Sequence, residues 1–241
     1  MQDDKIEKYY NEFFKHKENV QVNERIYACY KKMIKHGLVS SSTLLELGCG
    51  PGALTWLVSR KIKSGFIEAT DLSPYAIDFA KQHINNKNVF LYTGDVVKYK
   101  PQHAKSFDFI TLFDVLEHIP MQQHEKLFAN ITTYMHSKTL LLINIPNPQY
   151  IEYDEVHQPE TLQVIDQAIY INYLSDVLIK NNLLIKSMST NNIWVKEDYH
   201  FYMVKKKTTF EEIKLPSVRT FRQKIFSKLT HIYIKRVLKY P

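Results

Sequence analysis

The sequence predicts an α/β protein built on a doubly wound, mainly parallel sheet, and three observations lead to this fold class. Short apolar strands alternate with helical patterns over residues 43–181. A glycine-rich turn joins the first of these strands to the helix that follows it. Acidic residues follow several strands, at the rim where the carboxyl ends of buried parallel strands meet. The sequence therefore also predicts a ligand site at that rim.

The predicted elements follow one another without an internal repeat or a low-complexity linker. Residues 1–37 carry apolar side chains at three- and four-residue intervals, which predicts helical structure. Strands are predicted over residues 43–47, 66–70, 89–92, 107–113, 138–145, 183–189 and 199–204. Helices are predicted over residues 53–63, 74–85, 121–137 and 169–181.

The turn after the first strand concentrates the glycines of the chain. Six glycines occur in 241 residues, and Gly48, Gly50 and Gly52 fall within five positions. Such a turn lets the backbone approach a ligand where a Cβ would collide, and leaves N–H groups free at the helix start. Glu46 lies just ahead of the turn, where its charge would repel a pyrophosphate. We therefore expect a cationic or zwitterionic ligand.

The run from Glu46 to Gly52, Glu-Leu-Gly-Cys-Gly-Pro-Gly, resembles the first motif of the class I S-adenosylmethionine (SAM) dependent methyltransferases. The resemblance continues at matching intervals to about residue 206. It implies a Rossmann-like sheet of seven strands with an antiparallel last strand. It also implies an enzyme that binds SAM and releases S-adenosylhomocysteine (SAH). The alternative is an incidental strand-turn-helix in which the glycines serve only the turn.

Asp71 is the second anchor of the predicted cofactor site. It lies nineteen residues beyond Gly52, close to the interval of about 20 at which an acidic residue accepts hydrogen bonds from ribose hydroxyls in βαβ nucleotide sites. A helix cap or Asx-turn before Ser73 is the alternative. The resemblance implies that Asp95 contacts the adenine amino group, although a turn aspartate would also suit that position. The full predicted cofactor set is Glu46, Gly48, Cys49, Gly50, Gly52, Asp71, Leu72, Asp95, Val96, Phe113, Tyr9 and Tyr10.

The catalytic residues are predicted where the fourth strand ends, in Asp114-Val-Leu-Glu117-His118. This segment resembles the family's fourth motif, which borders the methyl group. We expect O-methylation, with His118 as the general base or as the residue that orients the acceptor hydroxyl, because histidine titrates near neutrality. Asp114 or Glu117 would support it. Alternatively, His118 caps a helix or packs beside the methionine part of the cofactor.

A metal-dependent variant is the main alternative chemistry. Asp114, Glu117 and His118, with His124 or His157, offer an O/O/N/N ligand set for Mg²⁺ or Mn²⁺. The arrangement is similar to the acidic-x-x-Glu-His element of small-RNA 2′-O-methyltransferases. Against this, the first acid is Asp rather than Glu, and no later His-rich element is evident. We therefore expect no metal.

The acceptor is predicted to bind the segment from residue 146 to about residue 168, which is too long for a minimal connector. Its candidate contacts are Tyr150, Tyr153 and His157. The chain looks like bacterial enzymes that methylate sugars or sugar-linked groups of surface polysaccharides at the cytoplasmic membrane face. Small-molecule methylation, as in quinone or secondary pathways, is the alternative acceptor class. A SAM-binding module without catalysis is the alternative outside enzymes.

Charge and composition predict three regions: a helical cap over residues 1–37, the methyltransferase domain over 38–207, and a basic amphipathic tail over 208–241. Of the net charge of +7, residues 214–241 supply eight basic residues and no acidic one. The rest of the chain carries 24 basic and 25 acidic residues, which disfavours a nucleic-acid partner. Residues 216–240 would contact an anionic membrane or pack on protein. Flotation with anionic vesicles can compare the full chain with a chain that ends near Lys214. Equal binding of the two would exclude membrane binding by the tail.

Two further observations bear on location and assembly. The two cysteines, Cys29 and Cys49, give no disulfide framework, and the N-terminus carries no signal pattern. We therefore expect a cytoplasmic protein, with the tail at the inner membrane face if it binds lipid. The sequence is silent on oligomeric state.

Overall fold

The computed structural model describes residues 21–209 without a break, together with residues 9, 12, 225, 226, 228–230, 232 and 233. The chain divides into two units, residues 1–207 and 208–241, and the fold below is that of the first. Tyr10, most of the predicted cap before residue 21, and most of the predicted tail lie outside the described residues. The membrane contact of residues 216–240 therefore stays a prediction.

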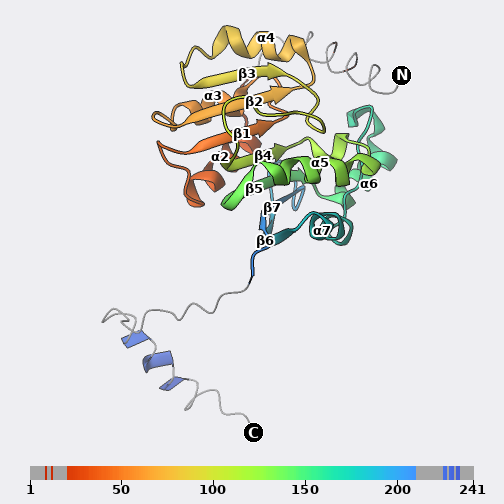
Figure 1. Cartoon of the computed structure of the whole chain (residues 1–241). Helices are drawn as coiled ribbons and strands as arrows, with labels where there is room; N and C mark the ends of the chain where they lie inside the picture. Colours follow the sequence, from red (N-terminus) through yellow and green to blue (C-terminus); the bar gives the residue numbers. More distant parts are fainter. Residues whose placement is uncertain are drawn as a thin grey trace. The chain divides into compact units, whose positions relative to one another are not determined.

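A seven-stranded sheet forms the centre of the first unit, in the order β3-β2-β1-β4-β5-β7-β6 (Figure 1). The strands are β1 (Thr43–Leu47), β2 (Phe66–Asp71), β3 (Val89–Thr93), β4 (Phe107–Phe113), β5 (Met135–Pro146), β6 (Leu183–Asn191) and β7 (Tyr199–Lys206). Strands β1 to β5 are parallel, and β7 pairs antiparallel with both β5 and β6. The predicted fold class is confirmed, antiparallel last strand included. The strand order reverses between β1 and β4, where α/β sheets open a crevice at their carboxyl ends.

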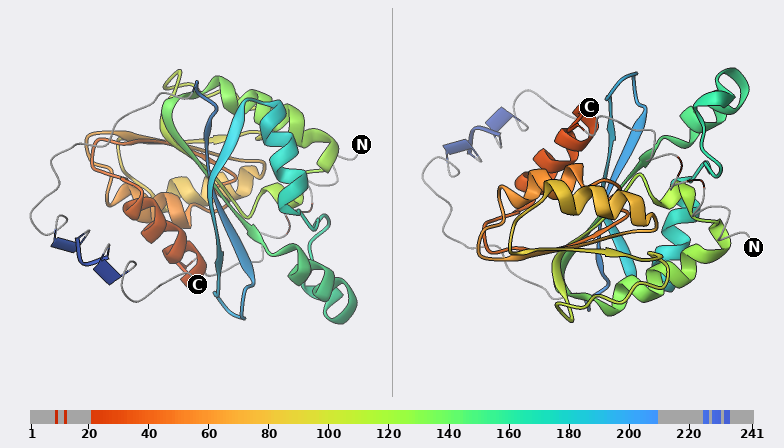
Figure 2. Two further views of the ribbon diagram at one scale, coloured as in Figure 1. Left: turned by 90° about the horizontal axis from the view of Figure 1, so that it is seen from below. Right: turned by 90° about the horizontal axis from the view of Figure 1, so that it is seen from above.

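Helices cover both faces of the sheet (Figure 2). The helices α2 (Glu24–Lys35), α3 (Ala53–Ser59) and α4 (Pro74–His83) bury apolar side chains on one face. The helices α5 (Met121–Thr133) and α7 (Ile171–Lys180) bury theirs on the other. Because both faces are covered, the central strands are apolar almost throughout, as the sequence predicted.

The connection after β5 differs from its prediction as a loop. It contains the helix α6 (Pro148–His157), which projects from the body in Figure 2, and the short 3-10 helix η2 (Pro159–Thr161). Asn147 caps α6 by accepting a hydrogen bond from the amide of Gln149, and Pro148 occupies the first turn. This pairing of a capping side chain with an N-terminal proline is a helix-start signal. The start of α6 is therefore encoded by residues next to it in the sequence.

The boundary between α5 and β5 also lies earlier than predicted. The helix ends at Thr133, and the strand begins at Met135 rather than at Lys138. Met135 pairs with Phe107 and is buried, so its side chain holds the chain in the sheet before the polar residues that follow it. A register shift between Phe107 and Phe109 accommodates this early start.

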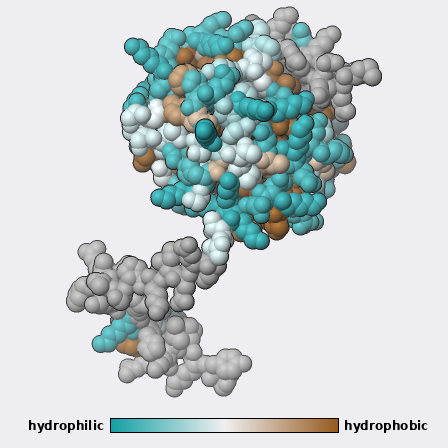
Figure 3. Space-filling view, in the orientation of Figure 1, coloured by the Kyte–Doolittle hydropathy of each residue, from teal (hydrophilic) through white to brown (hydrophobic). Residues whose placement is uncertain are grey.

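The surface of the described body carries no large apolar face in the view of Figure 3, where hydrophobic atoms form small, separate groups. Within the described part of the chain, we find no helix with the length and apolar character that a membrane span requires. The reversal of strand order between β1 and β4 makes the carboxyl ends of these strands the place to look for a ligand site.

Candidate active site

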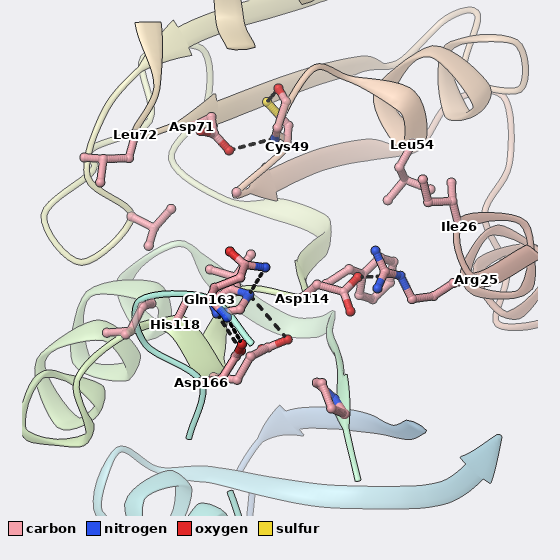
Figure 4. A pocket seen from close by; sticks show the side chains of 18 of the residues that line it. Arg25, Ile26, Cys49, Leu54, Asp71, Leu72, Asp114, His118, Gln163 and Asp166 are labelled. Atoms are coloured by element: carbon pink, nitrogen blue, oxygen red, sulfur yellow. Dashed lines mark hydrogen bonds and ion pairs between the residues drawn. The ribbon is translucent and has the colours of Figure 1, made fainter. Parts of the chain in front are cut away.

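A cavity of about 810 Å³ lies at the carboxyl ends of the central strands. This is within the range of about 300–1,000 Å³ typical of small-molecule sites. Its walls come from α2, the glycine turn, the ends of β2 and β4, residues 95–98, α6 and residues 161–166 (Figure 4). One end of the cavity is built by the glycine turn and Asp71. The other end is built by Asp114, His118 and the segment that contains Gln163 and Asp166.

The glycine turn has the backbone that the sequence predicted. Gly48, Gly50 and Gly52 have φ values of 78°, 53° and 85°, in the left-handed region that favours glycine. A Cβ on Gly48 would lie 2.2 Å from Cγ2 of Val115. The turn is therefore shaped by close approach of its backbone to the end of β4.

The amides of the turn are not free, contrary to expectation. The N–H groups of Gly48 and Cys49 donate to the carbonyl of Thr70, at 2.8 and 3.0 Å. The N–H of Gly50 donates to Oδ2 of Asp71 at 2.7 Å. The turn therefore offers a ligand space and a fixed shape rather than these three donors.

Gly52, a predicted cofactor contact, does not line the cavity. Its added Cβ would meet Cδ1 of Ile84 at 2.8 Å and Cβ of Ala80 at 3.0 Å. Gly52 therefore permits the turn to pack against α4. The other predicted residues of this group, Gly48, Cys49 and Gly50, do line the cavity.

Two buried carboxylates lie at the glycine-turn end. Oε2 of Glu46 accepts a hydrogen bond from Oγ1 of Thr55 at 2.7 Å, and burial raises the pKa of Glu46 to about 8. Oδ1 of Asp71 accepts from the amide of Ser73 at 2.9 Å, which is the Asx-turn alternative. Burial raises the pKa of Asp71, while its hydrogen bonds from Ser73 and Gly50 oppose that rise. Both carboxylates line the cavity, where their oxygens can accept further donors.

The remaining predicted cofactor contacts Leu72, Asp95, Val96 and Phe113 also line the cavity. Asp95 accepts from the amide of Val97 at 2.9 Å, and its Oδ2 lies 3.2 Å from Nζ of Lys98. Tyr9 is half-buried, and burial followed by the charge of Asp166 raises its pKa. Tyr9 thus lies within electrostatic range of the far end of the cavity.

At the far end, Asp114 is paired with a residue that the sequence did not single out. Nε of Arg25, on α2, lies 3.0 Å from Oδ2 of Asp114, and Nη1 of Arg25 donates to the hydroxyl of Tyr199 at 2.6 Å. Asp114 has φ = 57°, a left-handed value that is rare outside glycine and that occurs where a site constrains the backbone. Burial raises the pKa of Asp114 against the opposing charge of Arg25.

His118 is held by the segment after α6 (Figure 4). Its Nδ1 lies 2.7 Å from the carbonyl oxygen of Ile165 and 3.0 Å from Oδ1 of Asp166. These two acceptors place a proton on Nδ1, so Nε2 is the nitrogen that can gain or lose one. Nε2 lies 3.2 Å from the amide nitrogen of Gln163 and 3.9 Å from Oε1 of Glu117. The histidine is therefore fixed in orientation by groups on both sides of the ring.

The pKa values of His118 and Glu117 both lie above their ordinary values. Burial acts to lower the pKa of His118, but the charges of Glu117 and Asp166 outweigh it and raise that pKa to about 9. Burial raises the pKa of Glu117 to about 8, against the charge of His118. Such displaced pairs in a cavity are typical of proton-handling sites.

The predicted acceptor contacts divide into two groups. Tyr150 lines the cavity, whereas Tyr153 and His157 do not. These two side chains stack on one another on the outer face of α6, at 4.1 Å between ring centroids, and Tyr153 is 48% exposed. The helical turn that the sequence analysis treated as loop carries them away from the cavity.

The same turn brings Asp154, buried, to the cavity wall. Asp154, Gln163, Asp166 and Arg25 are among the lining residues that the sequence did not single out. The start signal at Asn147-Pro148 could have located α6 and hence Asp154. No local signal marks the other three.

The alternative metal ligand set is not assembled. His124 is buried, with Nε2 2.7 Å from the carbonyl oxygen of Ile119 and Nδ1 3.1 Å from the hydroxyl of Tyr173. His157 is on the outer face of α6. Among the described residues, no three His, Cys, Asp or Glu side chains are grouped so that they could hold a metal ion.

Comparison with known proteins gives the same answer as the motifs. Residues 44–138 match the family model described as a methyltransferase domain. The probable (S)-tetrahydroprotoberberine N-methyltransferase 2 of Papaver bracteatum is 22% identical, over 91% of this chain and 64% of its own length. The mitochondrial ubiquinone biosynthesis O-methyltransferase of Candida albicans is 33% identical, over 33% of this chain and 25% of its own length. The chain thus spans less than two thirds of the length of these curated relatives.

A solved structure extends the likeness to the fold. The magnesium protoporphyrin IX methyltransferase of Synechocystis PCC 6803, with bound SAH, superposes with a TM-score of 0.66 at 13% identity, covering 85% of this chain and 99% of its own. The sheet order, the glycine turn and the match over residues 44–138 agree on one assignment. Residues 44–138 are thus similar to a methyltransferase domain, and the fold is that of the class I SAM-dependent methyltransferases.

Proposed function

We propose that this chain transfers a methyl group from SAM to a hydroxyl oxygen of a small-molecule acceptor, for which a sugar or sugar-linked group is our first choice. The observation that carries the proposal is the continuity of one cavity. The glycine turn with Glu46 and Asp71 forms one end, and His118 with Glu117 forms the other. A cofactor bound at the first end would present its reactive group toward the second.

The residues at the glycine-turn end suit SAM. Gly48 lacks the Cβ that would fill the turn, and Leu72, Val96 and Leu54 provide apolar walls for a flat ring. Asp71 and Asp95 offer acceptors to hydroxyl and amino groups, and Glu46 offers a carboxylate to a positive ligand. SAM, when bound, supplies a methyl group already activated by its sulfonium charge, so the protein has to orient the acceptor, exclude water and remove a proton.

His118 is the side chain best placed to take that proton. Its Nδ1 is committed to Ile165 and Asp166, so a proton from an acceptor hydroxyl would pass to Nε2. Glu117, 3.9 Å from Nε2, would stabilise the resulting imidazolium. The raised pKa of His118 makes it a strong base that is mostly protonated near neutral pH, so the reaction would favour alkaline conditions.

Methylation of nitrogen is the second candidate. The Papaver bracteatum relative is named as an N-methyltransferase, and the acceptor end carries more carboxylates than cationic groups. An amine would also need to lose a proton before attack, so the same base would serve.

The test has two steps, on the full chain. Calorimetry with SAM and SAH should show binding of both, and mass spectrometry should then show a gain of one methyl group in a member of a pooled set of sugars, phenols and amines. Binding without any methylated product would identify a non-catalytic module. Absence of heat with both ligands would overturn the proposal, and fragmentation of the product distinguishes oxygen from nitrogen.

A further inference from the structure

The acceptor end of the cavity has more carboxyl groups than cationic groups. Four carboxylates contribute to it: Asp114, Glu117, Asp154 and Asp166. Two cationic groups oppose them. Arg25 lies 3.0 Å from Asp114, and His118 lies 3.0 Å from Asp166. Oε1 of Glu117 lies farther from His118, at 3.9 Å from Nε2. Asp154 has no ion pair within the described part of the chain.

The two carboxylates with the weakest pairing each have an unused oxygen. Oε2 of Glu117 and Oδ1 of Asp154 are buried, and neither has a hydrogen-bond partner among the residues that the structure describes. The residues themselves are only 1% and 6% exposed. The buried amide oxygen of Gln163 likewise lacks a donor there. A buried acceptor without a donor costs about 1–3 kcal/mol, and more when it is charged.

The residues that carry these oxygens belong to different elements and line one cavity. Glu117 is in the 3-10 turn η1 (Leu116–His118), Asp154 is on α6, and Gln163 follows η2. The charge of Asp166 raises the pKa of both Glu117 and Asp154, so all three carboxylates lie within electrostatic range of one another. Three separate segments thus contribute residues with unpaired acceptor oxygens to the wall of one cavity.

Resting on the proposed function, we infer that the acceptor carries a protonated amino group, and that Glu117, Asp154 and the amide oxygen of Gln163 bind it. The amino group anchors the acceptor while a separate hydroxyl faces Nε2 of His118. An ammonium group offers three N–H donors and one positive charge, which matches the acceptor oxygens and the charge imbalance. A neutral hydroxyl would supply one donor and leave the charge imbalance in place.

The experiment compares matched sugars on the full chain saturated with SAH, in buffer containing a chelator. Binding of D-glucosamine, N-acetyl-D-glucosamine and D-glucose is measured by ligand-observed NMR, which detects weak complexes. We expect glucosamine to bind at least roughly tenfold more tightly than the two neutral sugars, as expected for a charge-assisted hydrogen bond. Glucosamine binding equal to or weaker than that of the neutral sugars, or binding that requires added Mg²⁺, overturns the inference.

A pair of substitutions on α6 places the amino group. Asp154→Asn removes the buried charge at nearly constant size, and Glu155→Gln removes an exposed charge one residue away. We expect D154N to weaken glucosamine binding roughly tenfold and to leave glucose unchanged, with E155Q behaving as wild type. Equal behaviour of the two variants overturns the inference. The heat of SAH binding, measured on the same samples, separates this outcome from failure of the proposed function, in which that heat is absent.

Discussion

The two ends of the cavity are built in opposite ways. At the glycine-turn end, Asp71 accepts amide hydrogen bonds on both oxygens, and neither Glu46 nor Asp71 has a buried oxygen without a partner in the described residues. At the acceptor end, Asp114, Glu117, Asp154 and Gln163 each have one. The first end is complete without a ligand, whereas the second has polar groups whose partners would have to come from one.

The difference teaches how the two substrates of a transferase can be held. A nucleoside can be bound by a preformed shape, since its size and edges are constant. An acceptor of particular chemistry is selected by groups that are costly to bury unless it arrives, because the wrong molecule leaves them unpaired. Four substitutions test this contrast, and the largest effect is expected where shape is fixed.

Gly48→Ala should abolish cofactor binding. The added Cβ would lie 2.2 Å from Cγ2 of Val115, at a φ of 78° that alanine disfavours, so the turn must move. We expect the affinity for SAH, measured by calorimetry, to fall by at least roughly 100-fold. Gly37→Ala is the control, because Gly37 has φ = 98° but an added Cβ has nothing within 4 Å. If both variants bind SAH as wild type does, shape does not govern this end.

The two buried aspartates of the cavity should respond oppositely to loss of charge. Asp71→Asn removes acceptors from the amides of Gly50 and Ser73, and we expect it to lower the free energy of unfolding by about 1–3 kcal/mol. Asp154→Asn removes a buried charge that has an unused oxygen, so we expect the ligand-free protein to be unchanged or more stable by up to about 1 kcal/mol.

Urea unfolding of the ligand-free chain at pH 7 measures both changes. Asp78→Asn, at an exposed position on α4, controls for charge alone. A loss of stability in D154N as large as that in D71N would show that the acceptor end is as complete as the other, and the contrast would fail.

The sequence predicted the glycine-turn end well because its determinants are local. The strand, the turn and Asp71 lie within about thirty residues, and each follows from chain geometry. The acceptor end depends on contacts between distant segments, such as the hydrogen bond of Arg25 to Tyr199, 174 residues away. Asp166 reaches His118 only because α6 and η2 fold the intervening segment back onto the cavity.

The predicted site residues that do not line the cavity have the same origin. Treating residues 146–168 as a loop made every polar side chain there an equal candidate, and the aromatic residues Tyr153 and His157 were preferred. Once α6 forms, its 3.6-residue period separates neighbours in sequence: Tyr150 and Asp154 line the cavity, and Tyr153 does not. Gly52 belongs to the motif, but its lack of a side chain serves packing against Ala80 and Ile84 rather than the cavity.

The smallest expected effect concerns the proton. In the proposed reaction the active form of His118 is neutral, so kcat should rise with pH up to the pKa of about 9. Asp166 helps to raise that pKa, and Asp166→Asn should therefore move the acidic limb of the kcat profile to lower pH. Its plateau should fall by roughly tenfold, because the carbonyl of Ile165 alone then orients Nδ1. A profile with an unmoved limb would mean that His118 does not handle the proton, and the acceptor end would then serve binding alone.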